Sequence, residues 1–161
     1  FTDTPIWVKG SGAGSDKLAL HDRPSLTQLR ATQLASQKAY SLANLQPNQI
    51  DLAEVHDCFT IAEVLATEDL GFAERGEGGI FARNGQGRRN EGDVTVNASG
   101  GLKSKGHPLG ATGTGQAVEV FKQLRHQVEP TRQVRDAEVG LTHNVGGSGA
   151  TCAVHIFGRE R

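Results

Sequence analysis

The sequence predicts an α/β domain in which helices cover a mixed β-sheet in layers. Apolar residues change repeatedly between a period of two, typical of strands, and a spacing of three or four, typical of helices. The resulting order is strand, helix, strand, helix, strand, helix and then two neighbouring strands, which we expect to form an antiparallel hairpin. A chain of 161 residues is also long enough to bury one core of ordinary size.

Composition and charge exclude several classes of protein. Apolar residues make up 36% of the chain and there are 21 glycines, which excludes a disordered or collagen-like protein. The 17 Lys and Arg nearly balance the 18 Asp and Glu, so no overall field attracts nucleic acid or a membrane. The distant pair Cys58 and Cys152 is not a secreted disulfide framework, and no apolar run could span a bilayer. We therefore expect a cytoplasmic protein. Because Met is absent even at position 1, we expect the later part of a longer protein.

The first strand is expected at residues 5–9, where it is closed by a flexible turn of glycines at 10–14. The first helix is expected from Ser25, directly after Pro24, because apolar residues then recur at helical spacing. We expect this helix to end near Asn44.

The second strand and the second helix follow each other closely. Residues 50–55 alternate with a period of two and predict a strand. Helical spacing begins again at Cys58, which is therefore expected in the first turn of a helix. Either Asp57 or Thr60 is expected to cap that helix, with Glu63 completing a capping box.

The second half of the chain is rich in glycine. Residues 71–93 contain seven glycines and many charges, which predicts a loop or a short hairpin. The glycine-rich loop at 100–110 leads into the last helix, with Pro108 expected in its first turn. Residues 144–149 join the last two strands. The remaining strands are expected at residues 94–97, 138–142 and 151–157.

Chemistry in α/β domains gathers in loops at the ends of strands, and three unusual loops fall there, 55–59, 98–110 and 143–149. We expect these loops to meet. In the first, a thiol near the start of a helix favours the thiolate at Cys58, although the neighbouring Asp57 opposes it. The alternatives are a small buried Cys with a capping Asp, and a zinc site formed by His56, Cys58 and His143, whose spacing is unusual for zinc.

The other two loops offer groups for proton transfer and oxyanion binding. His107 lies among glycines, so its imidazole could donate to an oxyanion or accept a proton from a thiol; the alternative is a His held by the backbone in a tight turn. The backbone N–H groups of 144–149 could bind an oxyanion, or the segment could be an ordinary hairpin turn. Ser148 lies between two strands and is a poor candidate for a serine nucleophile.

Several motifs resemble those of one enzyme superfamily. The stretches Asn-Ala-Ser-Gly-Gly at 97–101, Gly-His-Pro-Leu-Gly-Ala-Thr-Gly at 106–113 and His-Asn-Val-Gly-Gly at 143–147 resemble the C-terminal half of thiolases. His-Asp-Cys-Phe at 56–59 resembles the sterol-carrier-protein branch, which includes archaeal acetoacetyl-CoA thiolases and lipid-transfer-like proteins. The resemblance implies a layered thiolase-like domain over residues 1–161, to which the absent N-terminal half could contribute a few residues within 1–14.

The resemblance implies acyl transfer between coenzyme A thioesters, with a role for each matching residue. His107 would activate the acyl-carrying Cys of the N-terminal half and stabilise the enolate oxygen. Cys58 would move the α-proton, and His56 stands where most thiolases have the Asn that holds an oxyanion-hole water. The N–H of Gly146 would complete the other oxyanion hole, and Phe59 would form a wall of the pantetheine tunnel.

Neither cysteine occupies the family's nucleophile position, so we expect this chain alone not to catalyse the complete reaction. Most thiolases place their acid/base Cys where this chain has Asn144, and Cys152 is expected in the core. No metal and no cofactor other than coenzyme A thioester substrates are expected.

The resemblance also implies partners and leaves alternatives open. A homodimer or homotetramer is expected, together with a small partner that carries an oligonucleotide-binding fold and zinc. One alternative function is an acyl-CoA retro-aldolase, although such relatives rely on Tyr and the single Tyr here, Tyr40, lies in the first predicted helix. The other is a non-catalytic thiolase-like module that binds acyl-CoA or lipid.

Overall fold

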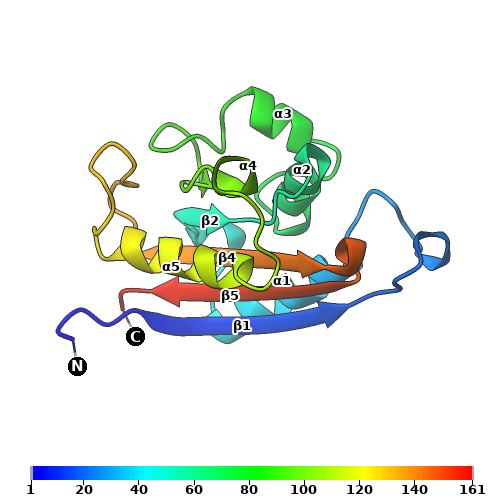
Figure 1. The fold of residues 1–161 in the computed structure, drawn as a ribbon, viewed down its shortest axis with the longest axis horizontal. Helices are drawn as coiled ribbons and strands as arrows, with labels where there is room; N and C mark the ends of the chain where they lie inside the picture. Colours follow the sequence, from blue (N-terminus) through cyan, green and yellow to red (C-terminus); the bar gives the residue numbers. More distant parts are fainter. Residues whose placement is uncertain (1, 161) are drawn as a thin grey trace.

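The computed structural model describes residues 2–160 and contains a mixed five-stranded sheet with the order β1-β5-β4-β2-β3 (Figure 1). Strand β5 is antiparallel to both of its neighbours, β1 and β4, whereas β2 runs parallel to both β4 and β3. The strands are β1 (Trp7–Ser15), β2 (Leu52–Glu54), β3 (Thr95–Val96), β4 (Val139–Gly146) and β5 (Thr151–Gly158). The predicted mixed sheet and the antiparallel final hairpin are therefore confirmed.

Helices cover both faces of this sheet (Figure 1). Helix α1 (Arg30–Ala43) packs on β1 and β5, and α5 (Thr112–Leu124) packs on β4 and β2 from the opposite side. Two clusters of buried side chains correspond to the two faces, one containing Ala35 and Val154 and the other Leu52 and Val120. The remaining helices are α2 (Thr60–Asp69), α3 (Gly78–Arg83), α4 (Gly101–Lys105) and three short 3-10 helices, η1 (Leu20–Asp22), η2 (Pro47–Gln49) and η3 (Gly147–Gly149).

The glycines at 10–14 were expected to form a flexible turn, and this prediction is wrong, because they lie inside β1. A Cβ atom on Gly12 would fall 2.0 Å from the carbonyl oxygen of Ala35 on α1, and one on Gly10 or Gly14 would meet the same helix at 2.2 Å. Alternate glycines of the strand thus face alanines spaced four apart on the helix. Backbone contacts backbone along this seam, and a strand with larger side chains could not come so close.

The helix expected from Cys58 begins later, at Thr60, so the thiol lies outside its first turn. Neither Asp57 nor Thr60 caps this helix, whose N-cap is Phe59. Asp57 instead accepts a hydrogen bond of 2.8 Å from the backbone N–H of Leu102, at the start of α4. A contact with a residue far away in the sequence has replaced the local cap.

Three further boundaries differ from the prediction. Helix α1 begins at Arg30 rather than at Ser25, and it ends where expected, with Asn44 as a left-handed C-cap at φ 54°. The segments predicted as loops contain the short helices α3 and α4. Pro108 lies outside α5, in a turn. The backbone carbonyl of Pro108 accepts the N–H groups of Ala111 and Thr112.

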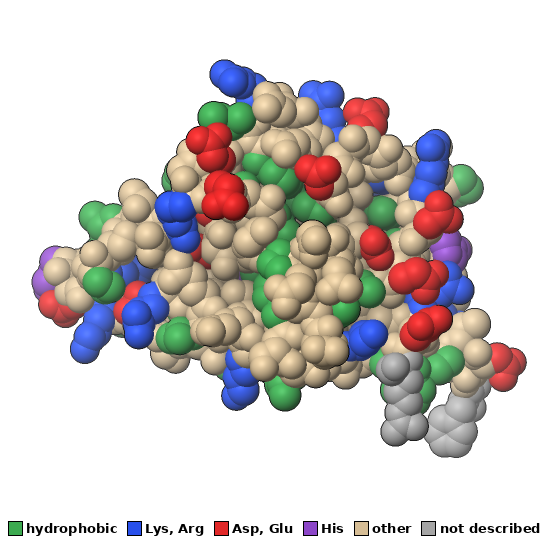
Figure 2. Space-filling model, turned by 180° about the vertical axis from the view of Figure 1, so that it is seen from behind, with side chains coloured by type: hydrophobic (Ala, Val, Ile, Leu, Met, Phe, Trp, Pro, Cys, Tyr) green, Lys and Arg blue, Asp and Glu red, His purple; other side chains and the backbone are tan. Residues whose placement is uncertain are grey.

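The surface agrees with the nearly neutral composition. On the face shown in Figure 2, basic and acidic side chains are interspersed. Within residues 2–160, no helix combines the length and apolarity that crossing a membrane requires.

Candidate active site

The three unusual loops meet around one cavity of about 580 Å³, as predicted. Cys58 and His107 both line it, together with His56, Phe59 and Gly146. The other lining residues are Leu20, Arg23, Ser25, Leu26, Gln28, Leu29, Ile61, Ala62, Leu65, Leu109, His143, Val145, Gly147, Ser148 and Gly149. All five residues singled out from the sequence thus surround the same space.

Cys58 is a free and exposed thiol, whereas Cys152 is buried on β5. Burial raises the pKa of Cys152 to about 11, which keeps this thiol protonated at neutral pH. The prediction that Cys152 belongs to the core is confirmed. At the rim, the ring of Phe59 is exposed, which makes it available to an apolar part of a ligand.

The hydrogen bonds of His107 connect its ring to the start of α5. Its Nδ1 lies 2.7 Å from the hydroxyl oxygen of Thr112, which is itself 3.2 Å from the carbonyl oxygen of Pro108. When the single hydroxyl hydrogen is donated to Pro108, the Thr112 oxygen accepts from Nδ1–H of His107. In the neutral ring of His107, Nε2 therefore carries a lone pair.

His56 lies edge-on to His107, with ring centroids 4.8 Å apart and an interplanar angle of 78°. Burial lowers the pKa of His56, and the nearby His107 lowers it further, while Asp57 acts in the opposite direction. His56 is accordingly neutral at neutral pH. Its Nδ1 lies 3.3 Å from Nδ2 of Asn144.

His143, on β4, is fully buried and contacts the backbone of His56. Its Nδ1 accepts the backbone N–H of His56 at 3.4 Å, and its Nε2 lies 2.9 Å from the hydroxyl of Thr32. Burial lowers the pKa of His143 to about 3, so this ring is neutral and structural. Among residues 2–160, no group of three or more His, Cys, Asp or Glu is arranged to hold a metal ion.

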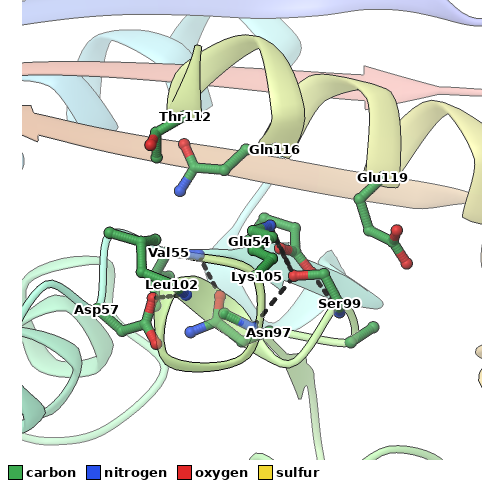
Figure 3. A network of polar contacts seen from close by, with 12 residues as sticks. Glu54, Val55, Asp57, Asn97, Ser99, Leu102, Lys105, Thr112, Gln116 and Glu119 are labelled. Carbon is green, nitrogen blue, oxygen red and sulfur yellow. Dashed lines mark hydrogen bonds and ion pairs between the residues drawn. The ribbon is translucent and has the colours of Figure 1, made fainter. Parts of the chain in front are cut away.

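A buried polar network holds the first and second loops together (Figure 3). Glu54, at the end of β2 and 1% exposed, accepts hydrogen bonds from the backbone N–H and hydroxyl of Ser99 and pairs with Lys105 at 3.1 Å. Asp57 is bound to Leu102 in the same region. Since Asp57 lies between the two site residues at 56 and 58, and Lys105 lies two residues before the site imidazole, these contacts position the site.

A neighbouring contact explains the outcome of the predicted capping box. Asn97 accepts the backbone N–H of Val55 at 2.8 Å and donates to Glu63 at 2.9 Å. Glu63 is thus engaged by a strand end and does not complete a box on α2. Sequence reasoning missed this network, although the polar residues Asn97 and Ser99 at the end of the third predicted strand hinted at it.

Residues 12–159 match the family described as thiolase C-terminal domain-like. The chain belongs to this thiolase family. It is 55% identical over 159 residues to the acetyl-CoA acetyltransferase of Methanothermobacter thermautotrophicus, covering 99% of this chain and 41% of that protein. It is 46% identical over 116 residues to human sterol carrier protein 2, covering 72% of this chain and 21% of that protein. The predicted branch is confirmed.

The thiolase fold is also seen in solved structures. The Ltp2-ChsH2(DUF35) aldolase matches with a TM-score of 0.83 over 98% of this chain and 40% of that chain, at 24% sequence identity. This likeness concerns the fold. The chain spans about two fifths of the length of the archaeal acetyl-CoA acetyltransferase and less of sterol carrier protein 2.

Proposed function

We propose that this chain supplies the proton-transfer and oxyanion-binding groups of an acetyl-CoA acetyltransferase-type thiolase. Such an enzyme cleaves a 3-ketoacyl-CoA with coenzyme A, or forms it by Claisen condensation. The observation that carries the proposal is that Cys58, His56 and His107 line one cavity. The names of the archaeal relatives support the same reaction. Because the chain spans only part of these relatives, the complete reaction requires the half that carries the nucleophile.

Each side chain suits one step of the condensation. The Cys58 thiolate removes the α-proton of an acyl-CoA, so a C–H bond breaks, an S–H bond forms and the electron pair moves onto the thioester oxygen. A ring N–H of His56 stabilises this enolate oxygen. His107 accepts the proton of the nucleophilic thiol through its Nε2 lone pair, and the resulting N–H donates a hydrogen bond to the same oxygen. The backbone N–H of Gly146 serves the oxyanion formed when the enolate carbon attacks the acyl group.

The size and lining of the cavity support a coenzyme A thioester as substrate. Its volume of about 580 Å³ lies within the roughly 300–1,000 Å³ typical of small-molecule sites. The apolar side chains of Phe59 and Leu109 are exposed beside the polar groups and suit the pantetheine arm. Coenzyme A thioesters act here as substrates, and no resident cofactor is proposed.

The test is thiolysis of acetoacetyl-CoA by the complete protein and by two alanine variants of its thiols. Cys58→Ala should lower kcat by about 10²–10⁴-fold, the usual contribution of a general acid–base group. Cys152→Ala is the matched control, because its thiol is buried in the core, and it should keep nearly all activity. Normal turnover by Cys58→Ala would refute the assignment of the base.

The alternatives give different results in the same assay. A binding module would hold acyl-CoA without any turnover. The similar fold of the Ltp2-ChsH2(DUF35) aldolase favours a retro-aldolase as the second candidate. The single Tyr argues against it, because the hydroxyl of Tyr40 donates to the backbone carbonyl of Leu70 at 3.0 Å, away from the cavity. That aldolase also supports our proposal of a small partner protein beside a homo-oligomer.

A further inference from the structure

Two side-chain amides, those of the buried Gln116 and the half-buried Asn144, form a hydrogen-bonded chain that ends at His56. Gln116 on α5 is fully buried, and its Nε2 donates to the backbone carbonyl of His143 at 3.0 Å. Its Oε1 lies 3.1 Å from Nδ2 of Asn144, and this Nδ2 lies 3.3 Å from Nδ1 of His56. Three hydrogen bonds thus connect a backbone carbonyl to the imidazole at the cavity.

The direction of every bond in this chain is determined by its first member. A backbone carbonyl can only accept, so the amide nitrogen of Gln116 must face it, which turns the amide oxygen toward Asn144. That oxygen also only accepts, so Asn144 must present its NH₂ group, whose second hydrogen then points to His56. Nδ1 of His56 is therefore the acceptor, and the proton of the neutral ring is on Nε2.

When the hydroxyl of Thr112 donates to the carbonyl of Pro108, the two cavity imidazoles have opposite tautomers. His107 donates through Nδ1 to Thr112 and retains a lone pair on Nε2, whereas His56 accepts at Nδ1 and carries its hydrogen on Nε2. In the proposed mechanism, the ring at position 107 must accept a proton and the ring at position 56 must donate a hydrogen bond. The tautomers match these two tasks.

We infer that Gln116 and Asn144 are positioning residues that keep His56 as an N–H donor toward the substrate oxygen. The inference rests on the proposed function for its catalytic consequence, but the tautomer itself can be observed without turnover. Neither residue needs to touch substrate to act in this way, because each determines the orientation of the next group. Asn144 would thus orient His56 from the position where most thiolases are expected to have their acid/base thiol.

The first experiment determines the tautomer in the complete protein labelled with nitrogen-15 histidine. Long-range proton–nitrogen correlation distinguishes a protonated from an unprotonated Nδ1, and the signals of His56 are identified from their loss in His56→Asn. We expect an unprotonated Nδ1 and a protonated Nε2 in the unmodified protein. A protonated Nδ1 would overturn the inference.

The second experiment reverses the hydrogen bond with Asn144→Asp. A carboxylate only accepts hydrogen bonds, so Nδ1 of His56 must now carry a proton. At alkaline pH, where the ring is neutral, Nε2 then carries a lone pair in place of its hydrogen. We expect kcat for acetoacetyl-CoA thiolysis to fall there by about 10²–10³-fold, as for one lost oxyanion donor, with little change in KM. The substitution adds one carboxylate beside this ring, and the other ionisable groups around it, Asp57, His107 and His143, are present in both proteins. An altered tautomer with unchanged kcat would overturn the inference.

A matched pair on α5 separates positioning from loss of a buried amide. Gln116→Met frees Asn144 to rotate, so a fraction of His56 should protonate Nδ1 and kcat should fall. Gln123→Met removes an equally buried amide seven residues further along the same helix. That amide is hydrogen-bonded to Glu119 and to the 132–134 segment, so the tautomer of His56 should be unaffected. Identical spectra and rates in the two variants would overturn the inference. If the tautomers change as expected but the unmodified protein shows no turnover, the proposed function fails and the positioning stands.

Discussion

The glycine seam between β1 and α1 predicts a large penalty for a very small substitution, Gly12→Ala. The added Cβ would lie 2.0 Å from the carbonyl oxygen of Ala35, whereas real Cβ contacts essentially never fall below 3.0 Å, so α1 must retreat by about 1 Å. Overpacking of this kind costs about 1–3 kcal/mol. For a domain of this size, 1 kcal/mol corresponds to roughly 2–4 °C, so Tm should fall by about 2–12 °C.

Thermal unfolding followed by circular dichroism measures this change. The matched control is Gly115→Ala on the exposed side of α5, where a Cβ would meet nothing within 4 Å. That variant should gain up to about 1 kcal/mol, because alanine favours the helix. A Tm of Gly12→Ala equal to that of the unmodified protein would refute the argument that the seam leaves no room for a methyl group.

Three further predictions concern the polar interior. His143 is buried and neutral with a pKa of about 3, so below pH ~6.5 this side chain binds a proton in the unfolded state and not in the folded state. Its contribution to the free energy of unfolding is therefore full above pH ~6.5 and should fall by roughly 2 kcal/mol between pH 6.5 and 5. Urea unfolding at the two pH values measures this loss, which His143→Gln should lack. Lys105→Met leaves the carboxylate of Glu54 buried without its cation and should cost about 1–3 kcal/mol in the same assay, most of it recovered by adding Glu54→Gln. Thr112→Val removes the hydroxyl that contacts the imidazole of His107 and should lower kcat about tenfold. The control is Thr114→Val, exposed on the same helix, which should leave kcat unchanged. Equal rates in the two variants would contradict the role of the Thr112 hydroxyl.

Much of the fold and the outline of the site could be predicted from local pattern. Changes of apolar period gave the order of the main elements, and the loops at 55–59, 98–110 and 143–149 meet because they follow neighbouring strands. The roles assigned to Cys58 and His107 stay predictions until activity is measured.

The errors share one physical cause, which is that a distant partner overrode a local preference. A glycine run favours a turn by itself, but at 10–14 it serves a helix that packs against it. Asp57 is a good local cap, yet its carboxylate is bound to Leu102. Gln116 shows no periodic signal, because its role depends on two hydrogen bonds that α5 makes to residues 143 and 144 of the central strand β4.

The opposite tautomers of His56 and His107 give the cavity an electrical asymmetry. The ring of His56 offers a hydrogen and the ring of His107 offers an electron pair, and the two ring centroids are 4.8 Å apart. A ligand with an anionic oxygen at one end and an acidic hydrogen at the other can form hydrogen bonds to both rings in a single orientation. In the reversed orientation, two donors face each other at one ring and two acceptors at the other. Inhibitors of this pocket should therefore be sensitive to the order of their polar atoms, and exchanging a donor and an acceptor should weaken binding without any change in shape.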